Sequence, residues 1–232
     1  MYTNYIAPLF EPKALKELAV WSMVSFVISA VWYYSTLFYF PDTLPIMAEL
    51  IGTFIVLICV ILTAKENLWC WPTGIVSVVL LGYAFYVYGL YSTTVLHLVY
   101  FLPIQFWSWY KWRVVGAAET TDLKVSVMSW DWRFVTLLAI VAGTVMVGTI
   151  VGLTDGAVYV YADASILVIS IIAQYLLSIK KLESWVLWIA VDIIAPVLYF
   201  MSGLYMVAAI YVVFFFIASG GLYGWYKSYK NA

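Results

Sequence analysis

One stretch near the C-terminal end carries side chains that could recognise a flat, positively charged molecule. Trp185, Trp188, Asp192, Ala195 and Tyr199 follow one another at intervals of three or four residues, so a helix would place them on one face. Indole and phenol rings attract cations and stack on planar rings. We therefore predict that this face binds a planar cation whose charge the carboxylate balances. The alternatives for the carboxylate are a structural hydrogen bond inside a helix bundle and a role in ion coupling.

Three further polar residues in apolar surroundings extend this predicted binding site. His97 and Gln105 are eight positions apart, which separates them by only about 80° around a helix, so both could line one cavity. Gln174 lies within another apolar segment and could face the interior of a bundle. Polar groups at membrane depth usually mark a ligand or ion path. For His97, packing without a ligand is the open alternative.

Three other residues are candidates for a gate or for ion coupling. Glu49 and Asp163 begin matching apolar segments, and Asn67 stands near the start of a third segment. Acidic groups in the first turn of a helix also complement its dipole, and this remains the alternative for Glu49 and Asp163.

The elements that must position these residues are predicted to be membrane-spanning helices. The chain of 232 residues is 66% hydrophobic and only 10% charged, whereas soluble domains have about a quarter charged residues. Its apolar runs are continuous and long enough for helices that cross a bilayer. We predict an all-α integral membrane protein with about eight spans, near residues 18–40, 44–63, 67–88, 94–112, 133–153, 162–179, 184–201 and 205–226.

The basic residues support this number of spans. If each span crosses once, all eleven Lys and Arg residues fall on the side of the N-terminus. Cytoplasmic loops carry the positive excess, so both termini are predicted to be cytoplasmic. Tryptophans and tyrosines near the span ends, including Trp112 and Trp225, are predicted to form an interfacial belt.

Motifs for other functions are missing from the sequence. It has no basic patch for nucleic acid, no phosphate-binding loop and no hydrolytic set of residues, so we expect neither nucleic-acid binding nor enzyme activity. No cofactor is expected, and no metal site is expected because no second His or Cys has ligand spacing.

An internal repeat organises the chain. "AELIGTFIVLICVILTAKENLWCW" at 48–71 resembles "ADASILVISIIAQYLLSIKKLESWVLW" at 162–188, and "SWYKW" at 108–112 resembles "GWYKS" at 224–228. With one helix between two three-helix copies, both copies enter the membrane from the same side, as in transporters built from parallel repeats. The predicted segments are 1–43 with an extra helix, 44–112 as the first repeat, 113–157 as connector and linker helix, and 158–228 as the second repeat.

Within this repeat, "DASILVISIIAQYLLSIKKLESWVLWIAVD", "GLY" and the two "WYK" motifs resemble the PnuC family of bacterial vitamin transporters over residues 44–228. The resemblance implies a SWEET-like bundle of three, one and three helices, preceded here by an added helix, in the inner membrane and often as a homotrimer. It implies facilitated diffusion of nicotinamide riboside, a form of vitamin B3 used in NAD biosynthesis, and a cytoplasmic kinase that traps the vitamin.

Other substrates remain open under this resemblance, since relatives are assigned to thiamine, riboflavin or deoxynucleosides. Nicotinamide riboside members often carry Asn at the place of Asp192, Gln at that of His97 and Asn at that of Gln105. We expect alternating access around a central cavity, with Trp185 and Trp188 stacking on the ring and Gln105 orienting a polar group. A proton-coupled transporter and a membrane enzyme or sensor using the same pocket are the other classes considered.

Overall fold

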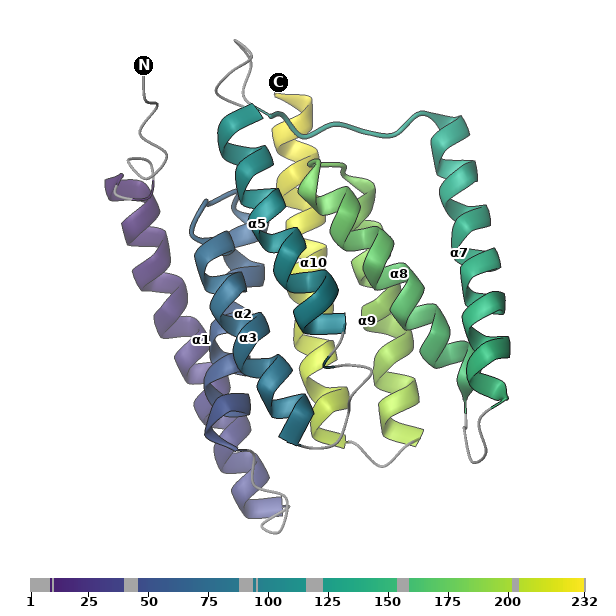
Figure 1. Cartoon of the computed structure of the whole chain (residues 1–232). Coiled ribbons are helices and arrows are strands. Elements are labelled where there is room, and N and C mark those ends of the chain that lie inside the picture. Colours follow the sequence, from purple (N-terminus) through teal and green to yellow (C-terminus); the bar gives the residue numbers. More distant parts are fainter. Residues whose placement is uncertain are drawn as a thin grey trace. The chain divides into compact units, whose positions relative to one another are not determined.

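The structure is a computed structural model that describes residues 9, 11–39, 46–87, 94, 96–115, 123–153, 159–201 and 205–231 (Figure 1). Within these residues it contains helices, turns and one isolated bridge between Ser126 and Lys181, and no β-strand. The all-α prediction is therefore confirmed. The chain divides into two compact units, residues 1–123 and 124–232.

Within its described residues, the first unit has four helical rods packed in chain order. Helix α1 packs on α2, α2 packs on α3, and α3 packs on a fourth rod that consists of three consecutive segments. The elements are α1 (Pro12–Tyr39), α2 (Met47–Ala64), α3 (Cys70–Val87), and then the π-helix η3 (Leu96–Phe101), α5 (Leu102–Tyr110) and the π-helix η4 (Lys111–Val115).

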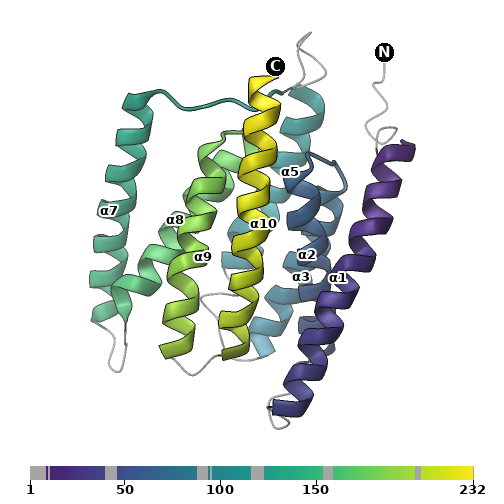
Figure 2. The ribbon, with the colours of Figure 1, turned by 180° about the vertical axis from the view of Figure 1, so that it is seen from behind.

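The second unit repeats this order of packing. Helix α7 packs on α8, α8 on α9, and α9 on α10, so α9 lies between two neighbours in the sequence (Figure 2). Its elements are α7 (Trp130–Gly152), α8 (Val160–Ser178), α9 (Glu183–Met201) and α10 (Tyr205–Lys230).

The predicted spans correspond to these elements, with some shifted ends. Helix α1 begins at Pro12 rather than at residue 18, α7 begins at Trp130 rather than at 133, and α10 continues to Lys230. Six of the described helices are long and apolar enough to cross a membrane. They are Pro12–Tyr39, Met47–Ala64, Cys70–Val87, Trp130–Gly152, Val160–Ser178 and Ala208–Lys230.

The fourth rod differs from the single α-helix predicted for residues 94–112. Leu96–Phe101 form the π-helix η3, and Pro103 follows inside the first turn of α5. Proline has no N–H to continue the ladder of hydrogen bonds and its ring crowds the preceding turn, so a local change of helix type beside it has a physical cause. Hydropathy alone does not distinguish a π-turn from an α-turn.

The turn that follows α2 recurs after α8. In the first unit, Glu66 has φ 55°, and the N–H groups of Glu66 and Asn67 bind the carbonyls of Thr63 and Leu62. In the second unit, the matching set is Lys180 with φ 52°, Lys181, Leu177 and Leu176. Both are helix ends of the Schellman type, with a non-glycine residue in the left-handed conformation. The same backbone geometry at an interval of 114 residues supports the internal repeat seen in the sequence.

In each unit this turn also binds the flanking helix or the segment just before it. In the first unit, the Asn67 amide donates to the Glu17 carboxylate at 2.9 Å, and the Trp69 indole donates to the Leu9 carbonyl at 2.7 Å. In the second unit, the equivalent residues act on the segment before α7. Lys181 donates to the Ser126 hydroxyl at 3.0 Å, and Glu183 accepts from the Met128 N–H at 3.0 Å. Helices α1 and α7 are therefore anchored in the same manner, each to its own unit.

Candidate functional site

The predicted binding face on α9 is largely buried. Trp185 is 1% exposed, Asp192 is 5% exposed and Ala195 is fully buried, while Trp188 is half-buried. Their helical spacing therefore places them on the inward side of α9. The side chain of Tyr199 lies outside the residues that the structure describes.

Asp192 brings two acceptor groups, its side-chain carboxylate and its main-chain carbonyl, to the same turn of α9. Within the described residues its carboxylate has no hydrogen bond and no ion pair, although it is 5% exposed. Pro196 lies inside the helix four residues later and has no N–H, so the main-chain carbonyl of Asp192 lacks its usual helical donor. A buried carboxylate is costly unless a cation, a proton or hydrogen-bond donors compensate it. The site thus requires a positive or donating partner.

Trp185 packs inside the second unit. Its ring meets that of Trp225 edge to face, with centroids 5.6 Å apart and planes at 86°. Gly221 on α10 makes this possible, because a Cβ there would lie 2.8 Å from three atoms of the indole. The indole N–H of Trp185 is buried without a partner among the described residues. Stacking of Trp185 on a ligand would require a state that uncovers the ring.

Trp188 contacts an apolar cluster that joins α8 and α9. The cluster consists of Ile166, Ile169, Val191, Ala195 and Leu198. Trp188 is only partly buried against it, and is the more accessible of the two predicted indoles. Gln174 on α8 is buried, and its main-chain carbonyl accepts a hydrogen bond from Ser178 at 2.7 Å.

In the first unit, Gln105 on α5 lies against α3. It is 8% exposed, and its Oε1 atom is buried without a hydrogen-bond partner among the described residues. Gly74 on α3 lies so close that a Cβ there would be 2.7 Å from Oε1. The Oε1 atom of Gln105 is therefore an acceptor that receives no hydrogen bond from the described residues.

His97 lies between two phenylalanine rings in the π-helix η3. Its ring centroid is 4.8 Å from that of Phe85 and 5.2 Å from that of Phe101. Gly82 on α3 lies against the neighbouring residue Leu98, since a Cβ there would be 2.9 Å from the Leu98 side chain and at ordinary contact distance, 3.4 Å, from Cβ of His97. His97 is half-buried, so the structure shows it in an aromatic environment and leaves its predicted ligand role as a proposal.

The three gate or coupling candidates lie in different surroundings. Glu49 is half-buried in the first turn of α2, and Asp163 is exposed in the first turn of α8. Asn67 is buried and its amide binds α1. Within the described residues no three His, Cys, Asp or Glu side chains gather closely enough to hold a metal ion.

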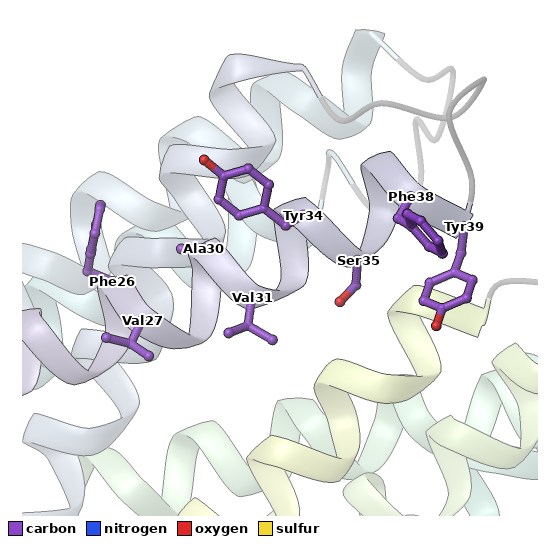
Figure 3. A pocket seen from close by; sticks show the side chains of 8 residues that line it. All are labelled: Phe26, Val27, Ala30, Val31, Tyr34, Ser35, Phe38 and Tyr39. Carbon is purple, nitrogen blue, oxygen red and sulfur yellow. The ribbon is translucent and has the colours of Figure 1, made fainter.

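An apolar hollow on α1 contains none of the predicted binding residues (Figure 3). It is lined by Phe26, Val27, Ala30, Val31, Tyr34, Ser35, Phe38 and Tyr39. These side chains are mostly exposed and apolar, as expected on a helix face that meets lipid acyl chains.

The chain matches the model of the nicotinamide mononucleotide transporter family over residues 46–227. This match extends from the start of α2 almost to the end of α10 and leaves α1 outside. The chain belongs to this family.

Several named relatives are similar to the chain over most of their length. The chain is 26% identical to the nicotinamide riboside transporter PnuC of Escherichia coli, over 79% of this chain and 86% of that protein. It is 30% identical to PnuC of Neisseria mucosa, over 76% and 65% respectively. It is also 27% identical to the riboflavin/roseoflavin transporter RibM of Streptomyces davaonensis, over 84% and 92%.

A solved structure of the family has the same fold. The crystal structure of the vitamin B3 transporter PnuC aligns with a TM-score of 0.69 and 26% identity, covering 92% of each chain. The chain is thus a multi-pass membrane protein of a transporter family.

Two tryptophans in this family member are placed differently from the prediction. Trp112 and Trp225 are buried, not part of an interfacial belt, and each meets a second buried tryptophan edge to face. Their neighbours Tyr110, Tyr223 and Tyr226 are exposed, as a belt requires. Gly74 was not singled out from the sequence, because a glycine's importance here depends on which side chain of another helix lies against it.

Proposed function

We propose that this chain is a membrane transporter that takes up nicotinamide riboside by facilitated diffusion. Family membership, two relatives named as nicotinamide riboside transporters and the fold shared with a vitamin B3 transporter support this function. No chemical change of the ligand is involved, so the chain acts as a carrier and not as an enzyme.

Asp192 favours a cationic ligand over an uncharged one. The family includes a transporter named for riboflavin, which is uncharged, whereas nicotinamide riboside carries a cationic pyridinium ring. A buried carboxylate with no ion pair among the described residues favours a ligand that brings a positive charge. Thiamine is also cationic and is therefore the closest alternative substrate.

The other predicted residues have separate roles in this proposal. Trp188 stacks on the pyridinium ring, and Trp185 does so only in a state that exposes it. Gln105 accepts a hydrogen bond from a polar substituent, and His97 and Gln174 serve the hydroxyl-rich ribose. The phenol of Tyr199 completes the face of α9.

The cellular setting is proposed from the sequence and the family resemblance. We place the chain in the bacterial inner membrane with both termini in the cytoplasm, and we expect a homotrimer. Alternating access moves the ligand down its gradient, with Glu49, Asp163 and Asn67 as candidates for gating. A cytoplasmic kinase that phosphorylates the vitamin would make uptake effectively one-way.

Uptake by reconstituted vesicles tests this function. Purified chain in liposomes should equilibrate labelled nicotinamide riboside faster than empty liposomes and should stop when the inside and outside concentrations are equal. A panel of thiamine, riboflavin and deoxynucleosides as competitors defines the substrate. Absence of nicotinamide riboside entry, with entry of a competitor, would show that the substrate is wrong.

Proton-coupled transport is the second candidate, because Asp192 is a buried acid that could carry a proton instead of meeting a cation. A pH gradient across the same vesicles distinguishes the two mechanisms. Facilitated diffusion predicts no accumulation above the outside concentration, whereas accumulation driven by the gradient alone would establish coupling.

A further inference from the structure

We propose that Gly74 is a positioning residue for the ligand, because the missing side chain at this position lets the Gln105 amide lie against α3 with its oxygen free to accept a hydrogen bond. This inference rests on the proposed function and names a specificity determinant of the same site. The group that Gln105 would receive is an N–H or O–H donor, such as a carboxamide or a hydroxyl of the vitamin.

The contact between the two residues is close and involves the whole amide. A Cβ on residue 74 would lie 2.7 Å from Oε1, 2.8 Å from Cδ and 2.8 Å from Nε2 of Gln105. Real Cβ atoms do not approach other atoms this closely, so any side chain at 74 must displace the amide. By contrast, a Cβ on Gly52 would meet the apolar side chain of Leu81.

The amide oxygen lacks a donor in the described chain. Gln105 Oε1 is buried without a partner there. Nearby hydroxyls are already engaged, since Ser77 donates to the carbonyl of Gly74 at 2.9 Å and Ser108 donates to that of Ile104 at 2.5 Å. Buried acceptors are nearly always satisfied, and an unsatisfied one at a binding site points to a donor on the ligand.

The second unit has the opposite arrangement of large and small side chains. At the interval of 114 residues set by the two equivalent turns, Gly74 corresponds to Trp188. If the last helices of the two units are aligned by the buried tryptophans Trp112 and Trp225, the residue equivalent to Gln105 is Ala218. If they are aligned by the two Trp-Tyr-Lys motifs, it is Gly221, which is also small. One unit thus offers an amide beside a glycine, and the other offers an indole where the glycine would be.

A double-mutant cycle tests the inference. Binding of nicotinamide riboside to the purified full chain is titrated by calorimetry for wild type, Gly74→Ala, Gln105→Ala and the double variant. We expect each single substitution to weaken binding by about tenfold, the usual effect of one lost hydrogen bond at a buried site. The double variant should bind no more weakly than Gln105→Ala, because the amide that Gly74 positions is then absent.

Gly52→Ala is the matched control, since it adds the same methyl group at a similarly crowded glycine in the same unit and should leave the dissociation constant unchanged. An unchanged dissociation constant in Gly74→Ala would overturn the inference. The inference would also be overturned if Gly74→Ala weakened binding as much in the Gln105→Ala variant as it does in the wild type. If Gly74→Ala does not fold, the double variant, which lacks the clash, must fold and bind as Gln105→Ala does.

Failure of the proposed function gives a different result. If wild type binds thiamine, riboflavin or a deoxynucleoside but not nicotinamide riboside, the proposed substrate is wrong and the same cycle is measured with the ligand that binds. If none of the four binds, both proposals are wrong.

Discussion

At the scale of single residues, both units contain a buried pair of tryptophans near the start of a helix. Trp71 meets Trp112 at 4.8 Å and 88°, and Trp185 meets Trp225 at 5.6 Å and 86°. The first indole of each pair has a buried N–H without a partner among the described residues. The rings therefore stabilise each unit by packing and edge-to-face contact, at the expense of an unmade hydrogen bond.

Two adjacent glycines on α10 give a matched test of this packing. Gly221→Ala should lower stability by about 1–3 kcal/mol, because the new methyl group overlaps the indole of Trp185. Gly220→Ala should not lower it, since nothing lies within 4 Å of a Cβ there. Thermal denaturation of the purified variants in detergent measures the difference, and equal midpoints for the two would contradict the described contact.

At the scale of elements, α1 and α7 are fastened by equivalent turns but with different chemistry. Asn67 uses an amide to hold Glu17 and the carbonyl of Ala14, whereas Glu183 pairs with Arg133 at 2.7 Å. The family match begins only at residue 46, yet α1 bonds to the turn that precedes α3. We infer that α1 contributes to the stability of the first unit.

Substitution of Asn67 tests this anchor. Asn67→Ala removes both hydrogen bonds to α1, which are worth about 1 kcal/mol each. Trypsin should then cut faster after Lys13 and Lys16, which are exposed at the start of α1. Asn231→Ala, at the exposed end of the chain, is the control. An unchanged rate of cleavage in Asn67→Ala would show that the anchor does not hold the helix.

The helices could be predicted from the sequence, but the contacts between them could not. Long apolar runs and the one-sided basic residues predicted the helices, and similar segments 114 residues apart predicted a repeat. The π-helix η3 and the anchors of α1 and α7 were not predicted, because they depend on main-chain register and on residues far apart in the chain. For the same reason Trp112 and Trp225 were assigned to a belt, although the structure buries them.

The burial of several predicted site residues followed from the sequence, but their contacts with other helices did not. A spacing of three and four residues correctly placed Trp185, Asp192 and Ala195 on an inward face, because helical period is a local property. The sequence could not show that Gln105 lies against Gly74 or that His97 lies between two phenylalanines, since these contacts join separate helices.

At the scale of the whole molecule, the basic residues predict an orientation in the membrane. Within the described residues, four basic side chains lie over aromatic rings: Lys65 over Trp21, Lys111 over Trp107, Arg133 over Trp130 and Lys230 over Tyr226. All four are predicted to be on the cytoplasmic side, and paired basic and aromatic residues are typical of a membrane interface.

Cysteine labelling in intact cells tests this orientation. A membrane-impermeant maleimide should label Leu153→Cys, which is exposed at the predicted outer end of α7, without permeabilisation. It should label Lys65→Cys only after the membrane is opened. The native Cys59 and Cys70 are buried, so the chain without an added cysteine gives the background level of labelling. Labelling of Lys65→Cys in intact cells would reverse the predicted topology.

The central claim is that Asp192 balances a positive charge on the transported vitamin. The most direct measurement titrates nicotinamide riboside and its reduced, uncharged form into wild type and Asp192→Asn, with the exposed Asp131→Asn as control. We predict that Asp192→Asn weakens binding of the cation by about tenfold or more and changes binding of the neutral form by less than about twofold. Equal affinity of wild type and Asp192→Asn for the cation, or an equal loss for both ligands, would contradict the claim.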